Sequence, residues 1–300
     1  MMNSSPVLNT IGIIGIIGIG AMGMGIAKNL QGRGYSLVVR DIRPQAHEEA
    51  AALGMCTCDS SAALGRQADV AVVVVVNAQQ IDDVLFGADG LVQPDKKVGT
   101  VLLCSTIAPE DSVRIAGRLA QHGIAVIDAP ISGGPARAES GLMSMMIAGD
   151  PATIATCEPL LTAMAAKRFA LGDAIGDAAK AKLVNNLLAG INLAAGAEAL
   201  ALAMKLGLDP HRIFDIIKAS SGNSWVFEDR MARALEDDFA PRAHAHILTK
   251  DMTLATGMAA AAGYATPLGD AALGQFRETL RRGWSELDDA AILKTYQDQD

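Results

Sequence analysis

Lys182 has surroundings in the sequence that suit proton transfer. It lies four residues before Asn186 in an apolar helical stretch, so the two side chains share one face of the helix. Burial there and the positive end of the helix dipole both disfavour an ammonium group, so we expect the pKa of Lys182 to be lowered. Such an amine can act as a general acid and base near neutral pH. Lys180 is expected to be an ordinary solvated lysine.

A glycine-rich turn that follows the first apolar run is typical of phosphate binding. It reads GIGAMG over residues 18–23. Gly18 allows a tight turn, Gly20 lets the backbone approach a pyrophosphate, and Gly23 packs the next helix against the strand. The N-terminus of that helix then faces the negative charge. We expect this turn, Met22 included, to bind a dinucleotide.

Asp41 ends the second apolar run, 18 residues after Gly23. An acidic side chain at this place can accept hydrogen bonds from the ribose hydroxyls of the cofactor. A carboxylate would repel a 2′-phosphate, which favours NAD over NADP. Arg40 and Arg43 flank Asp41 and leave NADP open, and the alternative role for Asp41 is that of a turn residue before Pro44.

Polar residues also follow two later strand-like runs. Asn77 comes after the valines at 72–76, and Thr106 comes shortly after Leu103. Because the carboxyl ends of parallel strands face the ligand crevice, we expect both side chains near the cofactor. Capping a helix is the alternative role for either of them.

A serine and two glycines occur together in the segment DAPISGGP at residues 128–135. The backbone N–H groups of Gly133 and Gly134 can form a nest that holds a carboxylate, and the Ser132 hydroxyl adds a donor. The alternative is a plain glycine turn between strands.

These residues need a scaffold that brings strand ends together, and the first half of the chain provides one. Its apolar runs are continuous rather than alternating, as expected of parallel strands that are covered on both faces. Helical stretches begin between them, for example at Pro109. This order predicts an α/β fold with a doubly wound, Rossmann-type sheet. The six runs are 11–17, 37–39, 70–76, 98–103, 124–127 and 145–148.

After Leu171 the β-branched runs stop, and Ala, Leu, Met and charged residues recur at helical spacing. We therefore expect a Rossmann domain over residues 1–172 and an all-α substrate and dimerisation domain over residues 173–300. The first helix should extend over residues 177–206, roughly 45 Å, which suits a spine between domains or a dimer contact. Gly190 and Gly196 inside it are either tolerated helix glycines or points of close packing.

Composition excludes several classes of protein. The 300 residues include 33 acidic and 25 basic side chains and are 50% apolar, with a net charge of −8. A chain with this charge and no basic cluster is not expected to bind nucleic acid. Residues 11–27 are uncharged, but their six glycines favour a strand, a turn and a helix start over a membrane span.

The cysteines and histidines indicate neither a secreted scaffold nor a metal centre. The four scattered cysteines fit a reducing cytoplasm, and the absence of a basic residue before Lys28 argues against a targeting segment. His244 and His246 lack a third ligand cluster, so a solvated loop after Pro241 is favoured over a metal site. No metal is expected. Residues 56–58 read as a strand edge.

Four ordered patterns together resemble the β-hydroxyacid dehydrogenase family: the GxGxMG turn, the DAPISGG segment, Lys182 with Asn186, and the pair Lys250-Asp251. The resemblance covers nearly the whole chain. It implies a helical second domain like that of 6-phosphogluconate dehydrogenase, NAD(P)-dependent oxidation of a small hydroxy acid, and a homodimer or homotetramer. A non-catalytic nucleotide-binding protein is the alternative, although the retained lysine and SGG segment disfavour it.

The resemblance also assigns roles to residues of this chain. It implies that Lys182 is the catalytic acid and base, and that Thr106 and Lys250 contact the cofactor, with Asp251 beside them. One departure is Ala178, where the family usually has glycine. The residues implied to hold the substrate are Ser132, Gly133, Gly134 and Asn186.

Within the family, residues 221–230 are most similar to the branch that acts on L-threonate. Asn223 and Ser224 offer hydrogen-bonding groups to a polyhydroxylated tail, whereas a 3-hydroxyisobutyrate pocket should be lined by apolar groups. We therefore expect NAD-dependent oxidation of L-threonate. The alternatives are a 3-hydroxyisobutyrate dehydrogenase or an NADPH-dependent reductase of glyoxylate, succinic semialdehyde or tartronate semialdehyde. Trp225 and Phe227 are expected to be core or interface aromatics.

Overall fold

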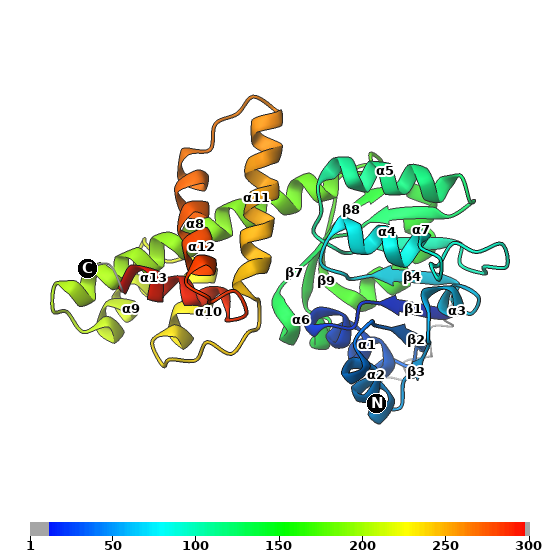
Figure 1. The fold of residues 1–300 in the computed structure, drawn as a ribbon, viewed down its shortest axis with the longest axis horizontal. Coiled ribbons are helices and arrows are strands. Elements are labelled where there is room, and N and C mark those ends of the chain that lie inside the picture. The colour runs from blue at the N-terminus through cyan, green and yellow to red at the C-terminus, as the bar shows by residue number, and fades with distance from the viewer. Residues whose placement is uncertain (1–11, 298–300) are drawn as a thin grey trace, which may run out of the picture. The chain divides into compact units, whose positions relative to one another are not determined.

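The computed structural model describes residues 12–297, which form two compact units. The first unit ends at Lys182 and is built of strands and helices, and the second begins at Leu183 and is helical (Figure 1). The predicted order of a Rossmann-type domain before an all-α domain is confirmed.

The first unit contains a nine-stranded sheet in the order β3-β2-β1-β4-β5-β6-β8-β7, with β9 paired to β8. Strands β1 to β6 are parallel, and their order is that of dinucleotide-binding sheets. Each of the six predicted runs contributes a strand. The strands are β1 (Ile13–Ile17), β2 (Ser36–Arg40), β3 (Cys56–Thr57), β4 (Val70–Val73), β5 (Thr100–Leu103), β6 (Ala125–Asp128), β7 (Ile131–Ser132), β8 (Met143–Gly149) and β9 (Ala165–Ala170).

The edge beyond β6 differs from the prediction that all of these strands are parallel. Strand β8 is antiparallel to both β6 and β7. Apolar runs indicate that a strand is buried but not in which direction it runs. Strands β7 and β9 lie outside the predicted runs, because β7 has two residues and the exposed β9 contains Lys167 and Arg168.

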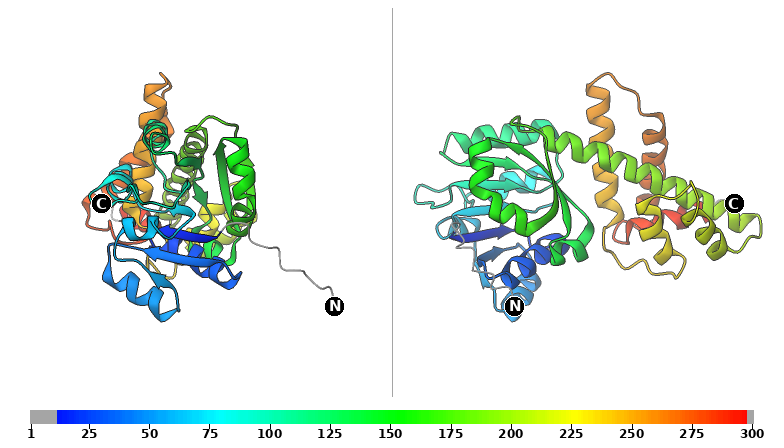
Figure 2. Two further views of the ribbon diagram at one scale, coloured as in Figure 1. Left: turned by 90° about the vertical axis from the view of Figure 1, so that its right-hand side faces the viewer. Right: turned by 180° about the vertical axis from the view of Figure 1, so that it is seen from behind.

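Helices cover both faces of this sheet, as Figures 1 and 2 show. Ile14 and Ile16 of β1 belong to the core under one layer of helices, and Ile17 belongs to the core on the opposite face. The strands are therefore buried on both sides, which explains their continuous apolar sequences. The first layer contains α1 (Ala21–Gly32), α2 (Pro44–Ala52), α6 (Gly134–Ser140) and α7 (Pro151–Met164), and the opposite layer contains α3 (Ser61–Gly65), α4 (Ala78–Phe86) and α5 (Pro109–Ala120).

Helix α8 (Asp177–Lys205) begins in the first unit and continues into the second. It is the one helix among residues 12–297 that is long and apolar enough to cross a membrane by length and composition. A Cβ atom at Gly190 would overlap Met252, and one at Gly196 would overlap Phe227. Both glycines are therefore points of close packing.

The second unit packs its helices around one core. Phe227 and Phe276 are among its largest fully buried side chains. The antiparallel pair α11 and α12 forms a long hairpin that is visible in Figures 1 and 2. The remaining elements are α9 (Pro210–Lys218), α10 (Trp225–Ala234), α11 (Ala245–Ala261), α12 (Pro267–Arg281), a 3-10 turn (Asp289–Ala291) and α13 (Ile292–Gln297).

Candidate active site

The three glycines of the first turn have the geometry that their spacing predicts. Gly18 has a φ of +88°, and a Cβ atom there would lie 2.6 Å from the Val74 carbonyl oxygen. A Cβ atom at Gly23 would overlap the Gly18 carbonyl, so helix α1 can pack this closely only on glycine. At Gly20 a Cβ atom would have only Arg43 Nη2 within 4 Å, at 3.8 Å. The turn is thus closed at Gly18 and Gly23 and open to a ligand at Gly20.

The first turn of α1 suits an anion. Gly20 is its N-cap, no side chain caps it, and its first turn contains no acidic residue. The backbone N–H groups at a helix N-terminus need an acceptor, and a pyrophosphate supplies one. Ser105, two residues after β5, also has a buried hydroxyl without a hydrogen-bond partner among the described residues. The residues present therefore fit a dinucleotide. Met22 packs partly buried against the sheet core.

Asp41 is paired with Arg43, one of the two arginines that flank it in the sequence. Its Oδ2 atom accepts a hydrogen bond from the Ile19 backbone N–H at 2.9 Å, and Arg43 Nε donates to Oδ1 at 3.0 Å. Burial by itself raises the pKa of Asp41, but the hydrogen bonds and charge of Arg43 outweigh it and hold the pKa below its usual range. Asp41 is therefore a buried carboxylate next to the glycine turn, paired with a guanidinium.

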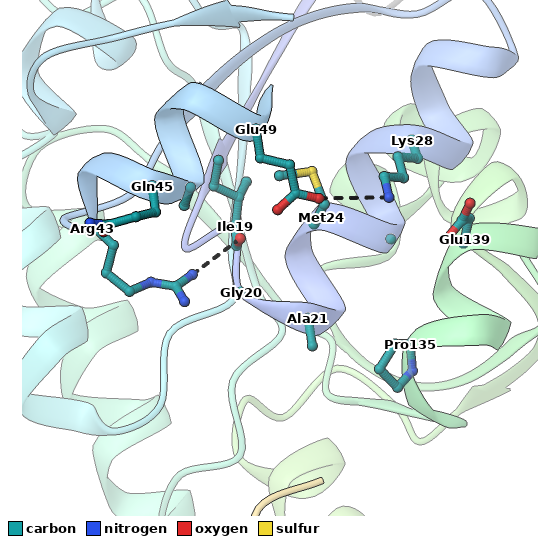
Figure 3. A pocket seen from close by; sticks show the side chains of 12 residues that line it. Ile19, Gly20, Ala21, Met24, Lys28, Arg43, Gln45, Glu49, Pro135 and Glu139 are labelled. Atoms are coloured by element: carbon teal, nitrogen blue, oxygen red, sulfur yellow. Dashed lines mark hydrogen bonds and ion pairs between the residues drawn. The ribbon is translucent and has the colours of Figure 1, made fainter. Parts of the chain in front are cut away.

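Arg43 also lines a pocket of about 310 Å³ beside the start of α1. Figure 3 shows its guanidinium directed at the Ile19 carbonyl oxygen, which Nη2 approaches to 3.3 Å. Across the pocket, Lys28 of α1 forms an ion pair with Glu49 of α2 at 3.8 Å. A cofactor ribose at Asp41 would lie near this pocket, so Arg43 belongs to the candidate cofactor site.

The polar residues after β4 and β5 differ in their roles. Asn77 caps α4, since its Oδ1 atom accepts a hydrogen bond from the Gln80 backbone N–H at 2.9 Å. Its Nδ2 group remains a donor. Thr106 directly follows the buried Ser105 and is partly exposed. Asn77 is therefore a helix cap, and the contact of Thr106 with the cofactor stays a prediction.

The two glycines after β7 have backbone conformations that favour glycine, and their binding of a carboxylate stays a prediction. Gly133 and Gly134 have φ values of +135° and +77°, which side chains rarely adopt. Ser132 ends the short strand β7, directly before them. A Cβ atom at Gly133 would also lie 2.9 Å from Arg137 Cδ, so the Arg137 side chain would have to move.

Asp128 has a structural role that its place in the sequence does not reveal. It ends β6, is 1% exposed, and accepts hydrogen bonds at Oδ2 from the backbone N–H groups of Gly176 at 2.9 Å and Ala179 at 3.2 Å. Burial raises the pKa of this carboxyl to about 6, although those hydrogen bonds lower it. Asp128 thereby anchors the start of α8. Ala178, where the family usually has glycine, is fully buried in this turn.

Lys182 and Asn186 follow on α8 and are both buried, at 6% and 8% exposure. Lys180, by contrast, is exposed and pairs with Asp177 at 2.8 Å, as expected of a solvated lysine. Asn186 Nδ2 donates a hydrogen bond to Asp251 Oδ2 at 2.7 Å, and Lys250 Nζ lies 2.8 Å from Asp251 Oδ1. Asp251 therefore contacts the side chains of Asn186 and Lys250. The spacing of residues in the sequence does not reveal its contact with Asn186.

Residues 221–230 carry local structural roles. Ser224 caps α10 by accepting a hydrogen bond from the Phe227 backbone N–H at 3.2 Å, and Asn223 Nδ2 donates to Glu228 at 3.4 Å. Phe227 is buried and stacks on Phe214, whereas Trp225 is half exposed. Phe227 is thus the core aromatic that was expected, and Ser224 serves its own helix.

Glu286 lies close to His244 and His246 and is the third potential metal ligand that the sequence did not reveal. One nitrogen of each imidazole and a Glu286 carboxylate oxygen lie within 4.8 Å of one another. The Nδ1 atoms of His244 and His246 face the carbonyl oxygens of Glu286 and Ser285 at 2.9 and 3.0 Å. Because a carbonyl only accepts, both Nδ1 atoms carry the proton, and Glu286 faces these protonated nitrogens rather than free lone pairs. The expectation of no metal stays a prediction.

Known proteins resemble the chain over nearly its whole length. A family model for the NAD binding domain of 6-phosphogluconate dehydrogenase matches residues 13–172, and one for the NAD-binding of NADP-dependent 3-hydroxyisobutyrate dehydrogenase matches residues 176–296. An L-threonate dehydrogenase of Cupriavidus necator is 39% identical over 283 residues, which cover 94% of this chain and 95% of the relative. An NAD-dependent L-serine dehydrogenase of Pseudomonas aeruginosa is 33% identical, covering 94% and 97%.

A crystal structure of 3-hydroxyisobutyrate dehydrogenase from Salmonella typhimurium superimposes with a TM-score of 0.87 at 35% identity, covering 94% of this chain and 99% of that one. Fold, glycine turn and relatives together define an NAD(P)-dependent dehydrogenase that acts on the CH–OH group of hydroxy acids. The chain belongs to the 3-hydroxyisobutyrate dehydrogenase-like family of β-hydroxyacid dehydrogenases.

Proposed function

We propose that the protein oxidises L-threonate to 2-oxo-tetronate with NAD, using Lys182 as the catalytic acid and base. The observation that carries this proposal is the pair Lys182 and Asn186, both buried and one helical turn apart on α8. The similarity to L-threonate dehydrogenases supports the substrate. Lys182 is 6% exposed, so its amine can exchange a proton with a bound substrate away from bulk water.

Each residue has one task in the proposed mechanism. Gly133 and Gly134, with the Ser132 hydroxyl, hold the substrate carboxylate through their N–H groups. Asn186 orients the hydroxyl that reacts, and Lys182 removes its proton. A bound NAD would supply the acceptor for the hydride that leaves the carbon bearing this hydroxyl.

The cofactor site would be formed by the glycine turn and by residues at the ends of neighbouring strands. Gly18, Gly20 and Gly23 admit the pyrophosphate, and Asp41 accepts hydrogen bonds from the ribose hydroxyls. Thr106 and Lys250 complete the contacts that the family resemblance implies, with Asn77 at the adjacent strand end. The Asp41 carboxylate favours NAD over NADP, because a 2′-phosphate there would meet a like charge.

A rate screen tests the proposed substrate and cofactor. Purified protein would be assayed with NAD and with NADP against L-threonate, D-glycerate, 3-hydroxyisobutyrate, 4-hydroxybutyrate and L-serine. We expect the highest kcat/KM for L-threonate with NAD. A higher value for any other acid would reassign the substrate, and reduced dinucleotide formed with none of them would contradict the proposal.

We further propose that the protein acts as a homodimer or homotetramer in the cytoplasm. Val184, Leu188 and Leu202 of α8 are each more than half exposed. A second copy of this chain would cover these apolar side chains. All four cysteines are free thiols, as in a reducing compartment. Light scattering on a sizing column gives the number of subunits, and a monomer would contradict the assembly.

A further inference from the structure

Asp251 of α11 lies between two side chains that have different proposed roles. It is 5% exposed, its Oδ2 atom accepts a hydrogen bond from Asn186 Nδ2 at 2.7 Å, and its Oδ1 atom lies 2.8 Å from Lys250 Nζ. Asn186 is proposed to orient the substrate, and Lys250 to contact the cofactor. One buried carboxylate therefore binds both groups.

The carboxylate determines which way the amide of Asn186 points. An amide oxygen facing Asp251 would place two acceptors together, so the Nδ2 group must face it. Oδ1 then accepts a hydrogen bond from Asn185 Nδ2 at 3.0 Å, which is consistent with this orientation. The second N–H of Asn186 lies in the same amide plane, so its direction is set as well. That N–H is the donor that a substrate oxygen can use.

We propose that Asp251 is a positioning residue that couples substrate orientation to cofactor binding through Asn186 and Lys250. This inference rests on the proposed function. Asp251 compensates the charge of Lys250 and fixes the amide of Asn186 at the same time, so a change at either partner is transmitted to the other. Asp251 itself touches neither substrate nor cofactor in this scheme.

The hydrogen bond from Asn186 needs an acceptor oxygen on residue 251, and the ion pair with Lys250 needs a negative charge there. A carboxylate accepts at both oxygens, whereas a carboxamide of the same shape accepts at one and donates at the other. In Asp251→Asn, the new amide can accept from Asn186 only if its own N–H faces the Lys250 ammonium, and the reverse orientation loses Asn186. The substitution therefore removes one partner while it keeps volume and shape.

The test compares Asp251→Asn with Asp270→Asn, the same substitution at an exposed position of α12. Three quantities are measured on the full chain: kcat/KM for the hydroxy acid at saturating NAD, the Kd of NADH by fluorescence, and the melting temperature. For D251N we expect kcat/KM to fall about 10- to 100-fold, as for other misplaced substrate contacts, and the Kd of NADH to rise about tenfold. D270N should leave all three unchanged.

Double variants separate positioning from a general loss of structure. In an Asn186→Ala background, D251N should cause little further loss of kcat/KM, and in a Lys250→Met background it should cause little further rise of the Kd. Fully additive losses, or a lower melting temperature with unchanged kcat/KM and Kd, would overturn the proposal. If the wild type oxidises no hydroxy acid, the proposed function fails first and this inference falls with it.

A second variant keeps the proposal testable where D251N does not fold. Lys250→Met removes a proposed cofactor contact and leaves Asp251 with Asn186 alone. Coupling predicts that K250M also lowers kcat/KM for the hydroxy acid when NAD is saturating, by about tenfold. An effect confined to the Kd of NADH would overturn the coupling.

Discussion

Asp128, at the end of β6, accepts a hydrogen bond at 2.9 Å from the backbone N–H of Gly176, and so ties the carboxyl end of β6 to the residue before α8. The same carboxylate oxygen also accepts from Ala179, three residues before Lys182. The helix that carries the proposed catalytic lysine therefore starts on a buried acidic side chain.

Asp128 should make stability depend on pH. Burial raises its pKa to about 6 in the folded protein, whereas an unfolded aspartate titrates near pH 3.9. The folded state holds the proton more tightly, so this group's stabilising contribution is complete below about pH 4 and is lost as the pH rises through about 6. For the wild type relative to Asp128→Asn, we expect the free energy of unfolding to fall by up to about 3 kcal/mol over that range.

Urea unfolding at pH 4.5 and 7 measures this difference. The exposed Asp173→Asn variant should show the same pH dependence as the wild type. Parallel curves for wild type and D128N would contradict the raised pKa.

Replacing Lys182 with alanine should abolish turnover while NADH still binds. A missing acid and base costs about 10²- to 10⁴-fold in kcat, whereas the glycine turn that is proposed to bind the cofactor is untouched. Stopped-flow rates and fluorescence titration measure the two quantities. Lys180→Ala, two residues away and exposed, is the matched control and should keep wild-type kcat. Equal activity of both variants would remove Lys182 from the mechanism.

Asp41→Asn should weaken NAD binding and strengthen NADP binding, each about tenfold, because the variant keeps an acceptor for Ile19 but loses the charge. The Kd values of both dinucleotides, measured by calorimetry, report the change. Asp59→Asn, an exposed position, should alter neither. A parallel loss of affinity for both cofactors would show that Asp41 is structural and not selective.

Gly190→Ala and Gly196→Ala should each destabilise the protein by about 1–3 kcal/mol, since the added methyl group overlaps Met252 or Phe227. Gly274→Ala on α12 is the contrasting control, because nothing lies within 4 Å of its added Cβ atom. Removing a glycine from an open helix position should stabilise by about 0.5–1 kcal/mol. Thermal unfolding gives all three values, and a neutral G196A would contradict the close packing.

Local sequence patterns predict the parts of the site that depend on local geometry. Helical spacing places Lys182 and Asn186 on one face, and the positions of Gly18 and Gly23 are explained by contacts within the turn and with the adjacent β4–α4 loop. Strand direction at β8 could not be predicted, because an apolar run reads the same either way. Gly190 was undecided because its partner lies 62 residues away in the sequence.

The parts of the site that the sequence did not predict are contacts between polar residues far apart in the chain. Asp251 and Asn186 are 65 residues apart, and Asp128 and Gly176 are 48 apart. Each pair needs the tertiary fold to bring a carboxylate to its donor, and residue type alone does not select the partner. Arg43 is a near neighbour of Asp41, yet only its side-chain conformation shows that it pairs with the carboxylate.

The close packing at Gly190 and Gly196 fixes the rotation of α8 about its own axis. Two bulky side chains fit against the helix at points six residues apart, so the helix cannot slip by one residue without collision. A single residue inserted between Lys182 and Gly190 would turn the Lys182 amine by about 100° around the helix axis relative to these two packing contacts. Insertions or deletions between Lys182 and Gly190 should therefore abolish activity, even though the altered segment would remain helical.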